Sequence, residues 1–316
     1  MIARSEELVT VFGGDGFVGR YVCEALLKAG VRVRVACREP RLAHFIQPLG
    51  QVGQFGFVKA DITHPASTRA AVSGASAVIN LVGAFRYMTA IHVDGARTVA
   101  KAAAEAGARA LVHISAIGAD PDSESEYGCT KGRGEQAVRK AFPQATIIRP
   151  SLVFGPEDSL TNRLASMASM APIVPVIAAT RRFQPIYVRD LGKAIAAAAL
   201  EPARYAAQTY ELGGPEVMTF RELNEQILKA AGIKADLVDM PDVFGSLASR
   251  FGWLPGAPLT RDQWLMLKRD NVVAGGAKGL EAFGIRPTPL AAVAPDWLGM
   301  YSGSRFGRRR VDIAAQ

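Results

Sequence analysis

The sequence is poor in the residues that build disulfide frameworks and metal sites. Its three cysteines, Cys23, Cys37 and Cys129, are odd in number and far apart. Its four histidines are scattered as well, and no two stand four positions apart, as paired zinc ligands on one helix do. We therefore predict neither a disulfide framework nor a metal site.

Long hydrophobic runs are also missing. A transmembrane helix needs roughly 20 apolar residues, whereas the longest candidate, residues 194–200, lies between Lys193 and Glu201. Residues 1–7 carry two glutamates and an arginine, which is unlike a secretory signal. We expect a cytoplasmic protein without a transmembrane segment.

The chain is basic, with a formal net charge of +8, and the excess is uneven. Four arginines crowd its last dozen residues: Arg305, Arg308, Arg309 and Arg310. Such a tail either contacts anionic lipid headgroups, nucleic acid or an acidic protein surface, or is a solvated end. No recognised nucleic-acid motif accompanies it, so we expect no nucleic-acid partner.

Short β-rich runs alternate with helical patterns along the first two-thirds of the chain. The expected strands cover residues 8–12, 31–36, 55–60, 77–82, 110–115 and 145–149, and the expected helices residues 17–29, 92–106 and 127–141. This rhythm predicts an α/β fold, a Rossmann doubly wound parallel sheet with helices on both faces. We predict a Rossmann domain over residues 1–190. A smaller C-terminal α/β lobe over residues 191–316, with segments interleaved with the Rossmann core, would end in the basic tail.

A glycine-rich turn follows the first expected strand. Gly13, Gly16 and Gly19 form G-x-x-G-x-x-G, and Phe17 and Val18 open the next helix. The glycines permit a tight turn, a close approach of the backbone to a pyrophosphate, and close helix–strand packing. The helix start offers free amides to the phosphates. A glycine triplet alone could be a surface turn, but the strand–turn–helix order favours a dinucleotide site.

The end of the second strand indicates which dinucleotide is bound. No carboxylate stands where an NAD site holds the ribose 2′-hydroxyl. Arg38 stands there instead and could pair with a 2′-phosphate, assisted by Arg20 or Arg41, although it could also be an ordinary surface arginine. We favour NADP(H) over NAD(H). Asp15 puts a carboxylate in the phosphate turn, and we expect it to cap the following helix.

Later strand ends should complete the nucleotide pocket, because parallel strands end at one edge of the sheet. Asp61 and Ile62 suit the adenine edge. Leu81, Val82 and Gly83 suit the far wall of the adenosine ribose. Pro150 and Val153 suit the nicotinamide carboxamide.

Tyr127 and Lys131 form Y-x-x-x-K and share one face of an expected helix. A neighbouring ammonium favours the phenolate and should move the tyrosine pKa towards the working range. Ser115, at the end of the fifth strand, could hydrogen-bond a substrate oxygen. Such a pair can also be a solvated helix face, but its place after the fifth strand favours a nicotinamide pocket.

Together these motifs resemble the extended or atypical short-chain dehydrogenases, of the NAD-dependent epimerase/dehydratase type. A narrower similarity covers most of the chain. It is to the NAD(P)H-binding accessory subunit of respiratory complex I (NADH:quinone oxidoreductase) and its bacterial homologues. The segments that carry it include IIRPSLVFGPED at 147–158, QPIYVRD at 184–190 and LTRDQ at 259–263.

This resemblance implies a tightly held NADPH that is not turned over, in a subunit that serves the assembly or stability of complex I. The protein would be peripheral on the cytoplasmic face of the inner membrane, and its basic tail would pack on the complex or near lipid headgroups. Tyr127 and Lys131 would then be inherited pocket residues. Two alternatives stay open. One is a free NADP(H)-dependent reductase or epimerase that uses Ser115, Tyr127 and Lys131 on a small carbonyl or sugar. The other is a redox sensor of NADPH.

The assignment of Arg38 predicts a selective effect on nucleotide affinity. Arg38→Ala should weaken NADPH binding and leave NADH binding nearly unchanged, because only NADPH carries the 2′-phosphate. Titration of both nucleotides against the variant checks this. Equal losses for the two would remove Arg38 from the 2′-phosphate site.

Overall fold

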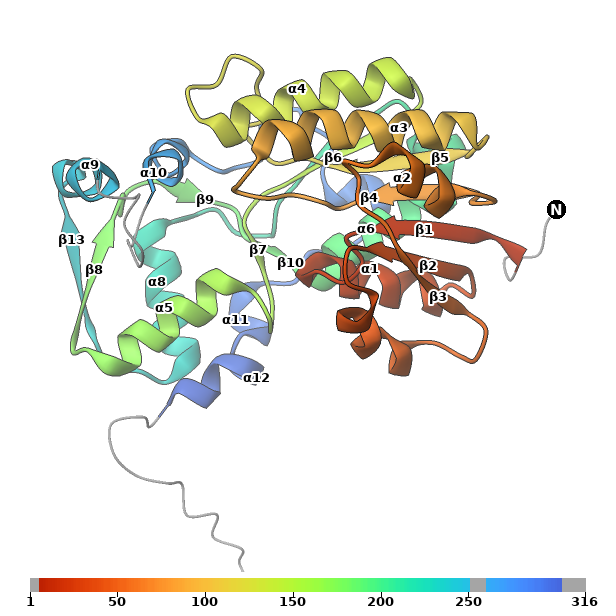
Figure 1. The fold of residues 1–316 in the computed structure, drawn as a ribbon. Helices are drawn as coiled ribbons and strands as arrows, with labels where there is room; N and C mark the ends of the chain where they lie inside the picture. The colour runs from red at the N-terminus through yellow and green to blue at the C-terminus, as the bar shows by residue number, and fades with distance from the viewer. Residues whose placement is uncertain (1–5, 251–259, 303–316) are drawn as a thin grey trace, which may run out of the picture.

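A seven-stranded parallel sheet forms the centre of the computed structural model, which describes residues 6–250 and 260–302 (Figure 1). The strand order is β11-β6-β5-β4-β1-β2-β3. The strands are β1 (Leu8–Phe12), β2 (Arg32–Cys37), β3 (Phe55–Lys59), β4 (Ala77–Asn80), β5 (Ala110–Ile114), β6 (Thr146–Pro150) and β11 (Thr209–Leu212). The predicted α/β Rossmann class is confirmed. The arginines of the basic tail, from Arg305 on, lie outside the described residues.

Helices cover both faces of this sheet (Figure 1). One face carries α1 (Phe17–Lys28), η2 (Pro40–Leu49) and α6 (Val188–Leu200). The other carries α2 (Pro65–Val72), η3 (Thr89–Gly95), α3 (Ala96–Glu105) and α4 (Glu126–Ala141). The helix expected over 92–106 is thus a π-helical turn followed by an α-helix.

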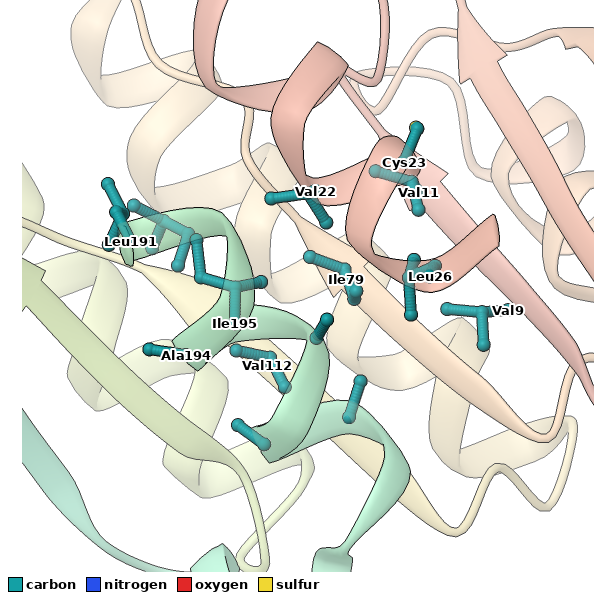
Figure 2. Close-up of a cluster of buried hydrophobic side chains, with 14 of the residues drawn as sticks. Val9, Val11, Val22, Cys23, Leu26, Ile79, Val112, Leu191, Ala194 and Ile195 are labelled. Atoms are coloured by element: carbon teal, nitrogen blue, oxygen red, sulfur yellow. The ribbon is translucent and has the colours of Figure 1, made fainter. Parts of the chain in front are cut away.

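The strands alternate their side chains between two hydrophobic cores. In β1, Val9 and Val11 belong to the core beneath α1 and α6, whereas Phe12 belongs to the core beneath α2 and α3. Figure 2 shows Val9 beside Leu26 of α1, and Val112 beside Ile195 of α6, in the same core. Both faces of a parallel sheet are buried, which is why its strands read as nearly continuous apolar runs.

Most of the other described elements build a smaller lobe from three two-stranded ribbons and several helices. The ribbons pair β7 (Val153–Phe154) with β10 (Ile186–Tyr187), β9 (Arg182–Phe183) with β12 (Met218–Thr219), and β8 (Ile173–Ile177) with β13 (Asp236–Met240). The helices include α5 (Ser159–Met170), α8 (Phe220–Ala231), α9 (Asp242–Arg250), α10 (Arg261–Leu267), α11 (Leu290–Val293) and α12 (Pro295–Leu298). The short turn η5 (Gly299–Tyr301) also packs in the lobe, whereas α7 (Pro202–Tyr205) and η4 (Leu280–Phe283) pack on the core beneath α1 and α6.

Two elements from beyond residue 187 return to the main sheet. β11 pairs with β6, and α6 packs on α1 across Gly192, where a β-carbon would lie 2.9 Å from the backbone of Tyr21. Segments of the Rossmann core and of the lobe therefore alternate along the chain. The division at residue 190 stays a prediction. In the described ranges no helix has the length and apolar character that crossing a membrane requires.

Leu26 offers a test of the α1–α6 layer. It has no exposed surface, so Leu26→Ala should lower the free energy of unfolding by about 2–5 kcal/mol, through lost burial and a residual cavity. Urea unfolding measures this. Val52→Ala, at a fully exposed position, is the control and should change it by less than about 0.5 kcal/mol. Similar small losses in both variants would contradict the packing.

Candidate functional site

The turn after β1 has the geometry that a pyrophosphate site requires. Gly13 adopts a left-handed backbone with φ of 75°, and its amide donates to the carbonyl of Ala36 at 3.1 Å, which ties the turn to β2. A β-carbon on Gly19 would overlap the carbonyl oxygen of Gly13. The backbone of α1 therefore approaches the turn more closely than any other residue type at Gly19 would allow.

The start of α1 is open to an anion. Gly16 is the N-cap, and no side chain caps the helix. The first amides of a helix have no acceptor within it, so Phe17 and Val18 present theirs at this end. The expectation that Asp15 caps the helix is wrong. Its carboxylate lies instead close enough to Cys37, at the end of β2, to add to the effect of burial in raising the pKa of that thiol to about 11.

The expected arginines at the adenosine end have different surroundings. Arg38 is exposed directly after β2 and forms no ion pair with the residues that the structure describes. Arg20 is not free to assist it, because it pairs with Glu157 and lies 4.1 Å over the ring of Phe45. The sequence could not show this contact, because Glu157 is 137 positions away.

Asp61 and Ile62 follow β3 at the same edge. Burial would raise the pKa of Asp61, but hydrogen bonds from Thr63, helped by nearby charges that include Arg38, hold it below its ordinary value. Ile62 is buried against Gly95, where a β-carbon would lie 2.6 Å from it. The Asp61 carboxylate thus lies close enough to Arg38 for their charges to interact, at the end of the site that would hold adenosine.

The loop after β4 joins the two ends of the cleft. A β-carbon built on Gly13 would lie 3.4 Å from Val82 and 3.5 Å from Leu81. A β-carbon built on Gly83 would lie 3.5 Å from the Lys131 Nζ. The loop therefore connects the phosphate turn to the expected nicotinamide end.

Lys131 reaches the end of β5 at the residue before Ser115. The Lys131 ammonium is buried and donates to the carbonyl of Ile114 at 3.0 Å. Burial lowers its pKa to about 8. The hydroxyl oxygen of Ser115 is buried and has no partner among the described residues. A buried polar group without a partner is costly, so this hydroxyl is suited to meet a ligand.

Tyr127 is close to Lys131 but is not activated by it. The Lys131 Nζ lies 5.8 Å from the centre of the Tyr127 ring. Burial, together with the carboxylate of Asp262, raises the pKa of Tyr127 to about 12. The expectation that the ammonium would lower this pKa is therefore wrong for this arrangement. The ring of Phe85 stacks on Tyr127 with centres 5.0 Å apart.

Two buried histidines that the sequence analysis passed over support this site. His92 accepts from the amide of Ala84 at 3.1 Å and contacts the Thr130 hydroxyl at 2.9 Å, joining the β4 loop to α4. His113 contacts the Asn80 side chain at 3.3 Å. Burial lowers the pKa of each imidazole to about 3. The sequence signal was weak, because a lone histidine on an apolar face is usually a core residue.

Pro150 and Val153 lie beside the same strand ends. The carbonyl of Pro150 accepts from Ile117 at 3.1 Å, two residues beyond Ser115. Val153 begins β7 and pairs with Ile186 of β10. The structure thus brings together the phosphate turn, the β4 loop, Ser115, Tyr127 and Lys131. In residues 6–250 and 260–302, no three His, Cys, Asp or Glu side chains gather as metal ligands.

Comparison with known proteins gives the family. The model of the NAD dependent epimerase/dehydratase family matches residues 9–213. The chain belongs to this family. A nicotinamide dinucleotide is thus the cofactor of its family, and the open helix start with the glycine cradle fits that group.

Two relatives cover nearly the whole chain. The 40 kDa subunit of mitochondrial NADH-ubiquinone oxidoreductase from Neurospora crassa is 30% identical, over 94% of this chain and 80% of its own. A ceramide reductase of Caulobacter vibrioides is 29% identical, over 96% and 94%. The resemblance to complex I accessory subunits is confirmed by the first.

Solved structures share the fold. The NADPH complex of an Escherichia coli quinone oxidoreductase has a TM-score of 0.74 at 19% identity, over 91% of this chain and 99% of its own. The NAD complex of a Thermus thermophilus UDP-glucose 4-epimerase has a TM-score of 0.68 at 18% identity, over 94% and 99%. The same fold thus accepts either nucleotide.

The buried imidazoles predict loss of stability in acid. A histidine in the unfolded chain has a pKa near 6.5, whereas His92 and His113 keep theirs near 3. Between these values the unfolded chain binds more protons, so stability should fall as the pH drops from 6.5 towards 3. Each imidazole contributes up to about 1.4 kcal/mol per pH unit. His92→Gln should reduce this slope in urea titrations from pH 7 to 4.5, and the exposed His64→Gln should not. An unchanged slope in His92→Gln would contradict the assignment.

Proposed function

We propose that this chain binds NADP(H) and serves as an accessory subunit of respiratory NADH:quinone oxidoreductase, holding the nucleotide without turning it over. The observation that carries the proposal is the contrast within the site. The turn at Gly13–Gly19 and the open helix start suit a pyrophosphate, whereas burial and the carboxylate of Asp262 raise the pKa of Tyr127 to about 12, away from the working range. Such a site is better suited to retaining a nucleotide than to acid–base exchange.

The subunit role draws its support from the similarity to the 40 kDa subunit, which covers the lobe as well as the sheet. The match to the 40 kDa subunit spans 94% of this chain, and it therefore extends past residue 213, where the family model ends. A partner-binding role needs the lobe as well as the Rossmann sheet, because the lobe supplies surface that the nucleotide does not use.

The choice of NADP(H) rests on Arg38. It follows β2 directly, and its guanidinium forms no ion pair with the described part of the chain. Asp15 opposes this choice, because its carboxylate lies near the same strand end. The arginine is exposed and can reach a 2′-phosphate outside the turn, so we give it the greater weight.

A reductase is the second candidate, and one observation favours it. The Ser115 hydroxyl is buried and unpartnered among the described residues, beside Lys131. There it could hydrogen-bond a substrate carbonyl, and Tyr127 could donate the proton to that oxygen. The nicotinamide would supply the hydride when bound. The Caulobacter relative, named a ceramide reductase, is similar over almost its full length.

Isolation from the native membrane under mild detergent tests the proposal. We expect this chain to co-migrate with NADH:quinone oxidoreductase and to release NADPH in near-stoichiometric amount on denaturation. Tyr127→Phe should keep both properties, because the phenol is not needed for retention. A free protein with rapidly exchanging nucleotide would overturn the subunit role. Large loss of turnover in Tyr127→Phe on an identified substrate would establish the reductase instead.

A further inference from the structure

Helix α9 presents its large apolar side chains to solvent and its small ones to the protein. Val243, Phe244 and Leu247 share one side of the helix and have 74%, 51% and 52% of their surface exposed. Gly245 and Ser249, on the other side, are buried. A surface helix normally buries its apolar side, so the exposed side of α9 is a candidate contact surface.

The packing beneath α9 fixes this orientation. A β-carbon on Gly245 would overlap the ring of Trp264, which is buried in α10, and would lie 2.7 Å from Ile177 of β8. Only a glycine fits between the helix and these two side chains. The helix therefore cannot turn Phe244 or Leu247 inward, and its apolar side stays outward.

The ribbon of β8 and β13 extends the apolar surface. Val174 is buried against α5 and α8. Side chains alternate along a strand, so Ile173 and Pro175 point the other way, and both are exposed. Val238 pairs with Pro175 and is exposed as well. Figure 1 shows α9 and this ribbon together at the end of the molecule away from the seven-stranded sheet. We name the six exposed residues the outer lobe face: Ile173, Pro175, Val238, Val243, Phe244 and Leu247.

Cations stand at both ends of the outer lobe face. Lys234 precedes β13 and Arg250 ends α9. Both are exposed, and neither forms an ion pair with the described residues. A β-carbon on Gly232 would lie 3.4 Å from the β-carbon of Ser302. The basic sequence of residues 303–316 therefore begins at the same end of the face as Lys234.

The acidic side chains near this face are mostly neutralised within the protein. Asp239 pairs with Arg221 at 2.6 Å, and Asp242 pairs with Arg181 at 3.5 Å. Asp236, beside Ile173 on the ribbon, forms no ion pair with the described part of the chain. Its charge is opposed by the two unpaired cations and by the arginines that follow Ser302. The surroundings of the face are therefore electropositive.

Apolar side chains between unpaired cations fit the interface of an anionic bilayer. The apolar groups enter the boundary between headgroups and acyl chains, and the cations meet the lipid phosphates. A bilayer is fluid, so it accepts side chains that protrude from a helix standing on a ribbon. A protein partner would need a surface shaped to match them.

We propose that the outer lobe face docks on the surface of an anionic bilayer. Val243, Phe244 and Leu247 lie in the interface, and Lys234 and Arg250 lie against the lipid phosphates. This surface goes beyond the proposed function and does not require the subunit role, because it is argued from the lobe alone.

Co-sedimentation of the full chain with lipid vesicles tests the proposal. We expect binding to vesicles of phosphatidylglycerol and phosphatidylcholine, and much weaker binding to phosphatidylcholine alone. The double variant Phe244→Gln/Leu247→Gln should bind the anionic vesicles at least about tenfold more weakly, because two apolar side chains no longer leave water. Arg250→Gln should weaken binding by about fivefold, and added salt should weaken it further.

Val52→Gln is the matched control, because Val52 is a fully exposed apolar residue outside the lobe. It should bind the vesicles as the wild type does. Thermal unfolding of the double variant should match that of the control, since Phe244 and Leu247 are exposed. No binding of the wild type to anionic vesicles, or equal binding by the wild type and the double variant, would overturn the proposal.

Three other occupants of the face would give different results, and each would overturn the proposal. Residues 251–259 follow α9 and contain no charged side chain. If they cover the face, the double variant loses thermal stability and the wild type does not bind vesicles. A second copy would appear as a dimer in light scattering that the double variant dissociates, again without vesicle binding.

A protein partner is the third. In that case the wild type fails to bind vesicles, and the double variant no longer co-migrates with NADH:quinone oxidoreductase. The failure of the subunit role is distinguishable from all of these. A chain that binds anionic vesicles through the outer lobe face, but does not co-migrate with NADH:quinone oxidoreductase, contradicts only the subunit role.

Discussion

Helix α1 approaches the turn after β1 so closely that a side chain at Gly19 would overlap the carbonyl oxygen of Gly13. This contact orients α1 so that its open N-terminus lies at the carboxyl ends of the parallel strands. It also seats α1 on the sheet, where α6 packs against it through Gly192. Because all seven strands are parallel, their carboxyl ends share this edge, and the candidate site residues follow these strand ends or stand on α4 after β5.

A buried polar network holds the far half of the cleft in shape. His92 ties the β4 loop to α4, Lys131 ties α4 to the end of β5, and His113 contacts Asn80 of β4. The helix turn that carries His92 is π-helical, and Gly134 of α4 packs directly on the His92 carbonyl. Buried polar groups rigidify a site when they are satisfied. His92 has partners at both ring nitrogens, whereas Nε2 of His113 is buried without a partner among the described residues. Both imidazoles stay neutral.

The same network bears on the two candidate functions in opposite ways. Burial and the carboxylate of Asp262 raise the pKa of Tyr127 to about 12, away from the working range, which favours retention of a nucleotide over acid–base exchange. The Ser115 hydroxyl is buried without a described partner, which favours a carbonyl ligand. The family includes relatives named as respiratory subunits and as reductases.

The sequence by itself determined the α/β class, the glycine turn after β1 and the place of Tyr127 and Lys131 on one helix. These follow from local periodicity and turn chemistry, which a short window of residues contains. Only the tertiary structure decided that Glu157 forms an ion pair with Arg20 and that Gly16, not Asp15, is the N-cap of α1. It also decided that the Asp262 carboxylate of α10 accepts from the backbone amide of Tyr127. It likewise decided that burial raises rather than lowers the pKa of Tyr127. The pairing of Arg20, the contact of Asp262 and the pKa of Tyr127 depend on burial or on partners up to 137 positions away, which no local pattern encodes.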